Sequence, residues 1–419
     1  MFDLTNQQKS RLCNNSFLKR EQSLRSQDPE VWRYINDQYY PSFRRFITNE
    51  PSEIDDFMML SGMPGLLPET LQKSITVNGN DVIISFKVTN VEIFLFKHNP
   101  GIITLEVEIL EPTLELYSSL VNGIRMYNSV IVSEQDGKEM SMLELIQDYI
   151  LNRAAGAGTF DLATSKTADY RGSKLKVFQA IDLKDTPPHG LINLLFELAT
   201  VSPINSTVDP DNENSHSPAY FHDVTSRALN IYNNWTALCL FDTFTMVGYH
   251  YLEKKSTLET WRMNYFRIYI YDLYFKYYLF SFNGDGLHED RRLKKQRRDF
   301  YNFLRIYEAD PISYNFLPNL IHTNIKTGLQ TQTETEGLRL RIDRITSLIS
   351  EDYNRMSNLI LFIISIIALI PSNWGEIIGE KDPLAIHRAN EITLTVKITL
   401  VVMFWLVNLI IRRTGKRPV

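Results

Sequence analysis

The chain has 419 residues, with 44 Lys and Arg against 49 Asp and Glu, which gives a formal net charge of −5. A charge of this size and sign does not indicate nucleic acid as a direct partner, because such proteins usually present a strongly basic surface. The cysteines, Cys13 and Cys239, lie far apart and outside any Cys-x-x-Cys or Cys/His pattern. This argues against a disulfide framework, a paired-cysteine metal site and an oxidising compartment.

The N-terminal half combines helical and strand patterns. Residues 29–47 form an aromatic helical face, with Pro41 as a kink or break. Asn78-Gly79 predicts a tight hairpin inside a β-meander over residues 73–110, with separate strands expected at 82–88 and 91–97. The remaining predicted elements are helices at 112–127 and 141–153 and a strand at 174–183. We therefore expect an α/β cytoplasmic head over residues 1–220, with no signal peptide before it.

After a Pro/Asn/Ser-rich loop at 203–218, the pattern is typical of long aromatic-rich helices. These are predicted at 223–250, 257–282 and 287–308, within a cytoplasmic helical region at 221–337. A heptad-like apolar stripe then follows, made of Leu338, Ile342, Ile345, Ile349 and Met356. It predicts a stalk helix at 338–356 that continues unbroken to residue 371 and self-associates, or alternatively packs against its own domain.

Apolar stretches at residues 358–371 and 392–411 dominate the C-terminus. The second has the roughly 20 residues that a membrane-spanning helix needs, and we read the first as the end of a longer helix. The expected domain is a transmembrane hairpin at 357–411 with an outer loop at 372–391 and a basic tail at 412–419. The alternative is a soluble helical hairpin. Lys/Arg bias places both termini in the cytoplasm of a protein of the inner membrane, with lipid as a partner.

Polar residues recur at seven-residue intervals in the first stretch, at Asn358, Ser365 and Ser372, and so share one helical face. Such a face usually lines a bundle interior or a water-filled pore. The predicted pore-lining set is Asn358, Leu361, Phe362, Ser365, Leu369, Ser372 and Asn373. An acidic outer mouth for cations is expected at Glu376, Glu380 and Asp382. Alternatively, Ser365 bonds its own helix and the loop is merely solvated.

The order of these parts resembles the CorA superfamily of two-span ion channels and transporters. The parts are an α/β head, a stalk helix running into a first span, an acidic connector, a second span and a basic tail. The resemblance implies a homo-oligomeric ring, a pentamer by analogy, although other ring sizes remain open. Magnesium-transporting members carry Gly-Met-Asn after the first span, where this chain reads Pro371-Ser372-Asn373-Trp374-Gly375. Magnesium selectivity is therefore in doubt.

Residues 219–248 and 259–283 also resemble the divergent CorA-like proteins found beside type III CRISPR systems. That resemblance implies a ligand-gated membrane effector of antiviral defence, triggered by a nucleotide second messenger such as an S-adenosylmethionine–AMP conjugate. Phosphates need cations and a base needs an aromatic plane. The candidate ligand-binding residues are Arg227, Trp235, Arg262, Tyr265 and Arg267, for which a purely structural role is the alternative.

No Walker, HExxH, GxSxG or paired-cysteine signature occurs in the chain. We therefore expect no catalytic residues, no metal site and no cofactor. Two other functions stay open at this point: a constitutive divalent-cation transporter of the CorA type, and a membrane-anchored enzyme that processes nucleotides.

Overall fold

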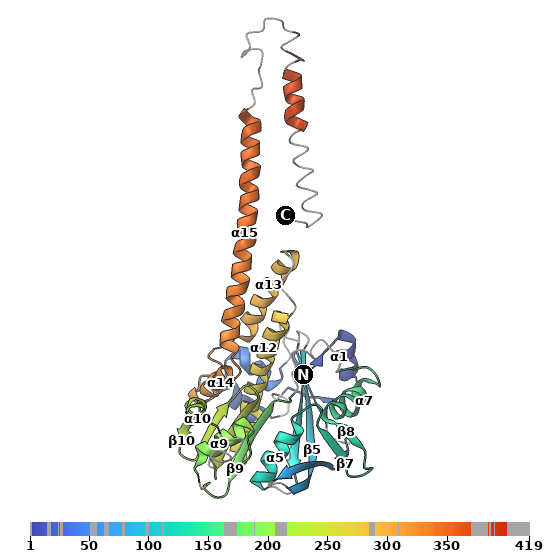
Figure 1. Cartoon of the computed structure of the whole chain (residues 1–419), viewed down its shortest axis with the longest axis vertical. Helices are drawn as coiled ribbons and strands as arrows, with labels where there is room; N and C mark the ends of the chain where they lie inside the picture. The colour runs from blue at the N-terminus through green and yellow to red at the C-terminus, as the bar shows by residue number, and fades with distance from the viewer. Residues whose placement is uncertain are drawn as a thin grey trace. The chain divides into compact units, whose positions relative to one another are not determined.

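The computed structural model describes most of the chain (Figure 1). It covers residues 2–369 apart from 15–17, 24, 26–27, 51–56, 63–66, 78–79, 97–99, 111–112, 163–173, 188, 206–215, 285–289 and 309, and then residues 384, 387–388 and 390–399. The chain divides into two compact units, Met1–Leu338 and Arg339–Val419.

The large antiparallel sheet of the first unit is organised around β5 (Asn80–Leu95). Strand β4 (Leu71–Val77) pairs with the first half of β5 and β3 (Met58–Gly62) with its second half, while β6 (Pro100–Ile109) pairs along the other edge. The outer strands are β1 (Phe2–Asp3), β2 (Lys19–Arg20), β7 (Val130–Ser133) and β8 (Glu139–Ser141). Ile84, Phe86 and Val88 are buried and Ile83 is exposed, as expected when alternate residues of a strand face opposite sides.

The predicted meander is confirmed in outline, with one difference. Residues 82–88 and 91–97, expected as separate strands, form the continuous β5, which bends at a register shift between Val88 and Asn90. A bulge of this kind bends a strand without ending it. The predicted turn Asn78-Gly79 lies outside the described residues.

Short helices cover the large sheet. Helix α5 (Leu114–Ile124), capped by the Thr113 side chain, packs on β4. Helix α6 (Met142–Glu144) leads through the π-helix η1 (Leu145–Leu151) into α7 (Asn152–Ala155), which contacts α1 (Asn6–Cys13).

The helical prediction at the N-terminus is confirmed as two helices, α3 (Pro29–Gln38) and α4 (Pro41–Thr48). Pro41 occupies the first turn of α4, where its missing N–H costs no helical hydrogen bond. The proline therefore separates two helices and does not kink one. Phe43 and Phe46 of α4 pack against Tyr271 of the later helix α12 (Phe266–Gly284).

A second, smaller sheet has the strand order β10 (Leu229–Tyr232), β11 (Trp235–Cys239), β12 (Thr243–Tyr249), β9 (Val177–Leu183). The predicted strand at 174–183 is confirmed, and β9 runs parallel to β12, so the sheet joins residues from both sides of the loop at 203–218. Helix α9 (Leu191–Thr200) packs on β11 and β12, and α10 (Pro218–Thr225) packs on α9.

The predicted helix at 223–250 is wrong. The segment begins in α10 and continues as the antiparallel strands β10, β11 and β12. All residues of β11 are buried, as are those of β12 up to Gly248. A strand buried on both faces reads as a continuous apolar run and lacks the alternation that marks a half-exposed strand.

The remaining helices of the first unit follow β12. Helix α11 (Lys255–Glu259) leads into the π-helix η2 (Thr260–Tyr265) and α12, while α13 (Asp290–Tyr307) and α14 (Phe316–Gly328) come later. These confirm the helices predicted at 257–282 and 287–308. Helix α12 packs on α14, and its Tyr274 stacks on Phe96 at 3.7 Å between ring centroids.

Helix α15 (Thr331–Leu369) begins within the first unit and continues into the second. The expectation of a helix that runs without a break through 338–356 is confirmed as far as Leu369. Leu338 and Ile342 are buried, whereas Leu340 and Leu348 are exposed.

The predicted C-terminal two-helix transmembrane domain is wrong for the described residues, where no helix has the length and apolar content needed to cross a membrane. The strongly apolar part of α15 covers only residues 359–369, well short of the roughly 20 that crossing requires. Residues 400–411 of the second expected span lie outside the described residues. The inner-membrane location and the ion-channel interpretation depended on these spans and are corrected with them, whereas the lipid partner stays an untested prediction.

Candidate functional site

The π-helix η2 and the first turn of α12 lie between the two sheets. Phe266, which follows η2, has its ring centroid 6.3 Å from that of Phe94 in β5 and 5.2 Å from that of Phe178 in β9. π-Helical turns are rare and occur frequently at functional sites. This segment carries three of the predicted ligand-binding residues, Arg262, Tyr265 and Arg267, and it contacts a fourth, Trp235.

One face of this segment is aromatic and meets the small sheet. Trp261 packs edge-on against Trp235 at 5.6 Å between ring centroids, and against Tyr265 at 4.7 Å. Tyr251 stacks on the other side of Trp235 at 5.4 Å. Trp235 is fully buried, and its Nε1 has no hydrogen-bond partner within the described part of the chain. Burial raises the pKa of the Tyr265 phenol, so the hydroxyl stays protonated.

The other face carries arginines and meets the large sheet. Arg262 lies in η2 and Arg267 in the first turn of α12, and both side chains contact residues of the large sheet. Arg262 is exposed and pairs with Glu106 of β6 at 2.5 Å. The Arg267 guanidinium lies over the Phe94 ring, 5.2 Å from its centroid. Its Nη1 is buried and has no hydrogen-bond partner among the residues described.

Charges on this face nearly balance. Burial lowers the pKa of Arg267, an effect that Glu92 and Glu21 oppose. Burial likewise raises the pKa of the Glu92 carboxyl, and Arg267 opposes that shift. Because carboxylates accompany the arginines, an incoming anion must displace or neutralise one of them to be held here.

Arg227, the remaining predicted ligand-binding residue, lies apart from this segment. It follows α10 and pairs with Asp223 of that helix at 3.1 Å, with both side chains substantially exposed. Its main-chain carbonyl accepts a hydrogen bond from Asn324 of α14. These contacts give Arg227 a surface role beside α10.

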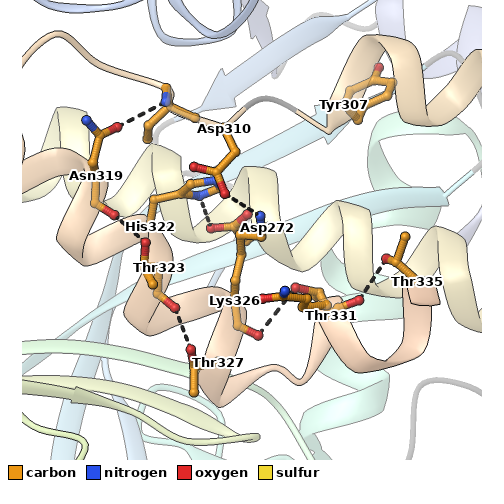
Figure 2. Close-up of polar contacts among 12 residues, drawn as sticks. Asp272, Tyr307, Asp310, Asn319, His322, Thr323, Lys326, Thr327, Thr331 and Thr335 are labelled. Carbon is orange, nitrogen blue, oxygen red and sulfur yellow. Dashed lines mark hydrogen bonds and ion pairs between the residues drawn. The ribbon is translucent and has the colours of Figure 1, made fainter. Parts of the chain in front are cut away.

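A second polar cluster occupies the middle of α12, and sequence reasoning missed it. Figure 2 shows Asp272 of α12 and His322 of α14 facing each other, with Lys326 beside Asp310. His322 Nδ1 and Asp272 Oδ2 are 2.8 Å apart, and each side chain is only 3% exposed. Lys326 Nζ lies 3.0 Å from the more exposed Asp310. Burial raises the pKa of Asp272, while His322 opposes that shift.

Helix α14 is anchored at both ends. At its start, Asn319 Oδ1 accepts hydrogen bonds from the main-chain N–H groups of Ile312 and Ser313, each at 3.0 Å. At its end, Gly328 lies against β11 so closely that an added Cβ would overlap the main-chain carbonyl of Cys239. Between them Asn324 accepts a hydrogen bond from the Cys239 N–H at 2.8 Å. The Asp272–His322 pair thus sits on a firmly held helix.

The far part of α12 meets the beginning of α15. Lys276 is 2% exposed at its side chain and pairs with Glu334 of α15. Its Nζ also lies 4.4 Å from the Phe280 ring centroid and 4.9 Å from that of Phe241. Burial lowers the pKa of Lys276, and the bond to Glu334 opposes that shift. One helix therefore connects the η2 segment, the buried Asp272–His322 pair and α15.

The residues predicted to line a pore fall on α15 or beyond it. Asn358, Leu361, Phe362, Ser365 and Leu369 are exposed positions of α15, and Ser365 Oγ donates to the Leu361 carbonyl at 2.8 Å. Ser372, Asn373, Glu376, Glu380 and Asp382 lie outside the described residues. The pore and mouth roles presupposed membrane spans that the described helices do not provide.

Within the part of the chain that is described, no group of three or more His, Cys, Asp or Glu side chains is arranged to hold a metal ion. Comparisons with known protein families, curated proteins and solved structures found no match to this chain.

Proposed function

We propose that this chain is a ligand-triggered effector that senses a nucleotide second messenger at η2 and the start of α12. The proposal takes its biological setting from the resemblance of residues 219–248 and 259–283 to effectors beside type III CRISPR systems. It is carried by one observation: Arg267 holds a buried guanidinium nitrogen with no hydrogen-bond partner among the described residues. A buried donor without an acceptor is costly, and a phosphate oxygen would satisfy it.

Arg262 supports the same assignment. Its pair with Glu106 is exposed on both sides, and exposed ion pairs contribute only about 0–1 kcal/mol. A phosphate can therefore replace the Glu106 carboxylate at little cost and gain a two-pronged guanidinium contact. Glu92 opposes an anion less than an ordinary carboxylate would, because its raised pKa favours the neutral form when negative charge approaches.

The aromatic face supplies the second part of a nucleotide site. Trp261 and Tyr265 come from the same π-helix as Arg262, so base-stacking and phosphate-binding groups have a fixed spacing. Stacking of a base on an aromatic ring contributes about 1–3 kcal/mol. Trp261 and Tyr265 are buried, so a shift of the π-helical turn must expose one ring face before a base can stack on it.

We propose binding without catalysis, and the thiols of the chain in particular are poorly suited to nucleophilic attack. Burial raises the pKa of Cys239 well above its ordinary value, and that of Cys13 is also raised by burial. A thiol with a raised pKa supplies little thiolate at neutral pH.

Isothermal titration calorimetry of the purified full chain tests this proposal. The titrants are AMP, ATP and the S-adenosylmethionine–AMP conjugate, and at least one should bind with saturation. Arg267→Met and Arg262→Gln should each weaken binding about tenfold to a hundredfold, since a hydrogen bond to a charged group contributes about 1.5–3 kcal/mol. Arg227→Gln is the matched control and should bind as the unaltered chain does. Absence of saturable heat with all three titrants, or equal weakening by Arg227→Gln, would reject the site.

A separate observation favours self-association through α15. Leu361, Phe362 and Leu369 are 58%, 64% and 80% exposed. Successive residues of a helix are about 100° apart, so these side chains project on more than one side. Exposed apolar surface of this extent usually marks an interaction site, and we propose that further copies of the chain cover it as a homo-oligomer.

Native mass spectrometry tests the assembly. Phe362→Glu should shift the population toward monomer, whereas Leu340→Glu, an exposed position earlier on α15, should not. A monomeric unaltered chain at micromolar concentration would reject self-association.

A further inference from the structure

The root of α15, defined as residues 331–338, contacts α12 through an ion pair that is buried on the α12 side and 29% exposed at the Glu334 side chain. Lys276 of α12 is almost completely buried and pairs with Glu334, the side chain of the root that reaches it. Thr331 and Thr335 are buried on the same side of the root, while Glu336 and Gly337 are exposed. The contact therefore lies on the single face by which the root packs.

The pairing is incomplete. Glu334 Oε1 bonds Lys276, but the other carboxylate oxygen, Oε2, is buried and has no hydrogen-bond partner within the described residues. An ion pair with a buried partner gives little net stability, because the buried Lys276 charge loses its hydration and Glu334 loses part of its own. An unpaired oxygen makes the closed arrangement weaker still, so a modest perturbation can open it.

The connection before the root can act as a hinge. Leu329 and Gln330 separate α14 from α15, and Gln330 has φ of 58°, in the left-handed region that residues other than glycine adopt with strain. On its other side, Gly328 is fixed against Cys239. Rotation at Gln330 would move the root while α14 stays in place.

We propose that Lys276–Glu334 is an ionic latch that keeps the root of α15 closed on α12, and that ligand binding at η2 opens it. The link to the ligand rests on the proposed function; the latch itself does not. Arg267 and Lys276 lie on one continuous helix, about 14 Å apart at 1.5 Å per residue. A displacement of the start of α12 by a ligand is therefore carried to Lys276, and separation of the pair frees the root.

Hydrogen–deuterium exchange of the full chain tests the latch. Glu334→Gln removes the charge and keeps the shape, and it should speed exchange of the main-chain amides of residues 334–342 by about tenfold. Glu336→Gln is the matched control, an exposed carboxylate on the same helix, and should leave those rates unchanged. Equal rates in the two variants would overturn the latch.

A double variant tests whether the ion pair transmits ligand binding to the root, separately from whether it keeps the root on α12. Lys276→Met with Glu334→Leu replaces the pair by apolar side chains and should keep the thermal midpoint close to that of the unaltered chain. The S-adenosylmethionine–AMP conjugate should speed exchange of the root in the unaltered chain and have no effect in the double variant. Binding of the conjugate without any change at the root of the unaltered chain would overturn the latch and leave the proposed function intact. Absence of binding would reject the proposed function, while the comparison of Glu334→Gln with Glu336→Gln would still decide the latch.

Discussion

Replacing His322 with leucine should destabilise the protein strongly and in a pH-dependent way. The substitution removes the group that pairs with Asp272 at 2.8 Å in a site where both side chains are 3% exposed. Removing one partner of a buried pair typically costs about 3–5 kcal/mol, because the other charge stays buried without compensation. We expect a loss of this size in the free energy of unfolding at about pH 8.

The loss should shrink as the pH falls. Burial raises the pKa of Asp272 and His322 holds the rise back, so the leucine variant has a still higher pKa at this carboxyl. A carboxyl group whose pKa is higher in the folded than in the unfolded protein contributes its full stabilisation at pH values below the unfolded pKa. This contribution is lost as the pH rises through the folded pKa. At about pH 5.5 the variant can protonate Asp272 and avoid much of the penalty.

Urea denaturation followed by circular dichroism at both pH values measures the effect. The double variant His322→Leu with Asp272→Leu removes both buried polar groups and should recover most of the stability lost by the single one. A penalty of the same size at both pH values would refute the reasoning, since it would mean that loss of packing, and not the stranded carboxylate, causes the effect.

Two further comparisons use thermal unfolding. Gly328→Ala should lower the free energy of unfolding by about 1–3 kcal/mol, because the added Cβ would overlap the Cys239 carbonyl. Gly337→Ala has no atom near its added Cβ and should raise the free energy of unfolding by about 0.5–1 kcal/mol. Equal effects of the two substitutions would contradict the close approach at Gly328. Tyr269→Phe should be nearly neutral, because the buried hydroxyl has no hydrogen-bond partner in the described part of the chain. Tyr271→Phe should lower the free energy of unfolding by about 1 kcal/mol, because its buried hydroxyl donates to a main-chain carbonyl. A larger loss for Tyr269→Phe than for Tyr271→Phe would contradict these hydrogen-bond assignments.

Elements with local signals could be predicted from the sequence. The division of residues 29–47 at Pro41, the strands around β5 and the unbroken course of α15 all follow from spacing, turn residues and the absence of breakers. The segment 223–250 was wrongly predicted as a helix, because its strands β11 and β12 are buried on both faces and lack the alternation of polar and apolar residues that marks a strand. The C-terminal spans are not found among the described residues, because the apolar part of the long helix α15 covers only residues 359–369 and the residues before it are largely polar.

The candidate site shows the same division. Residue type within the segment 259–283 pointed to Arg262, Tyr265 and Arg267, which lie close together in η2 and the first turn of α12. The sequence did not indicate Glu92 and Glu106, which the large sheet brings to those arginines. It also did not indicate the pairs Asp272–His322 and Lys276–Glu334, whose members lie 50 and 58 positions apart in the chain. Helices and turns are decided by interactions between near neighbours, which a sequence displays directly. Buried charge pairs are decided by which distant segments pack together, and only the tertiary structure places those side chains in contact.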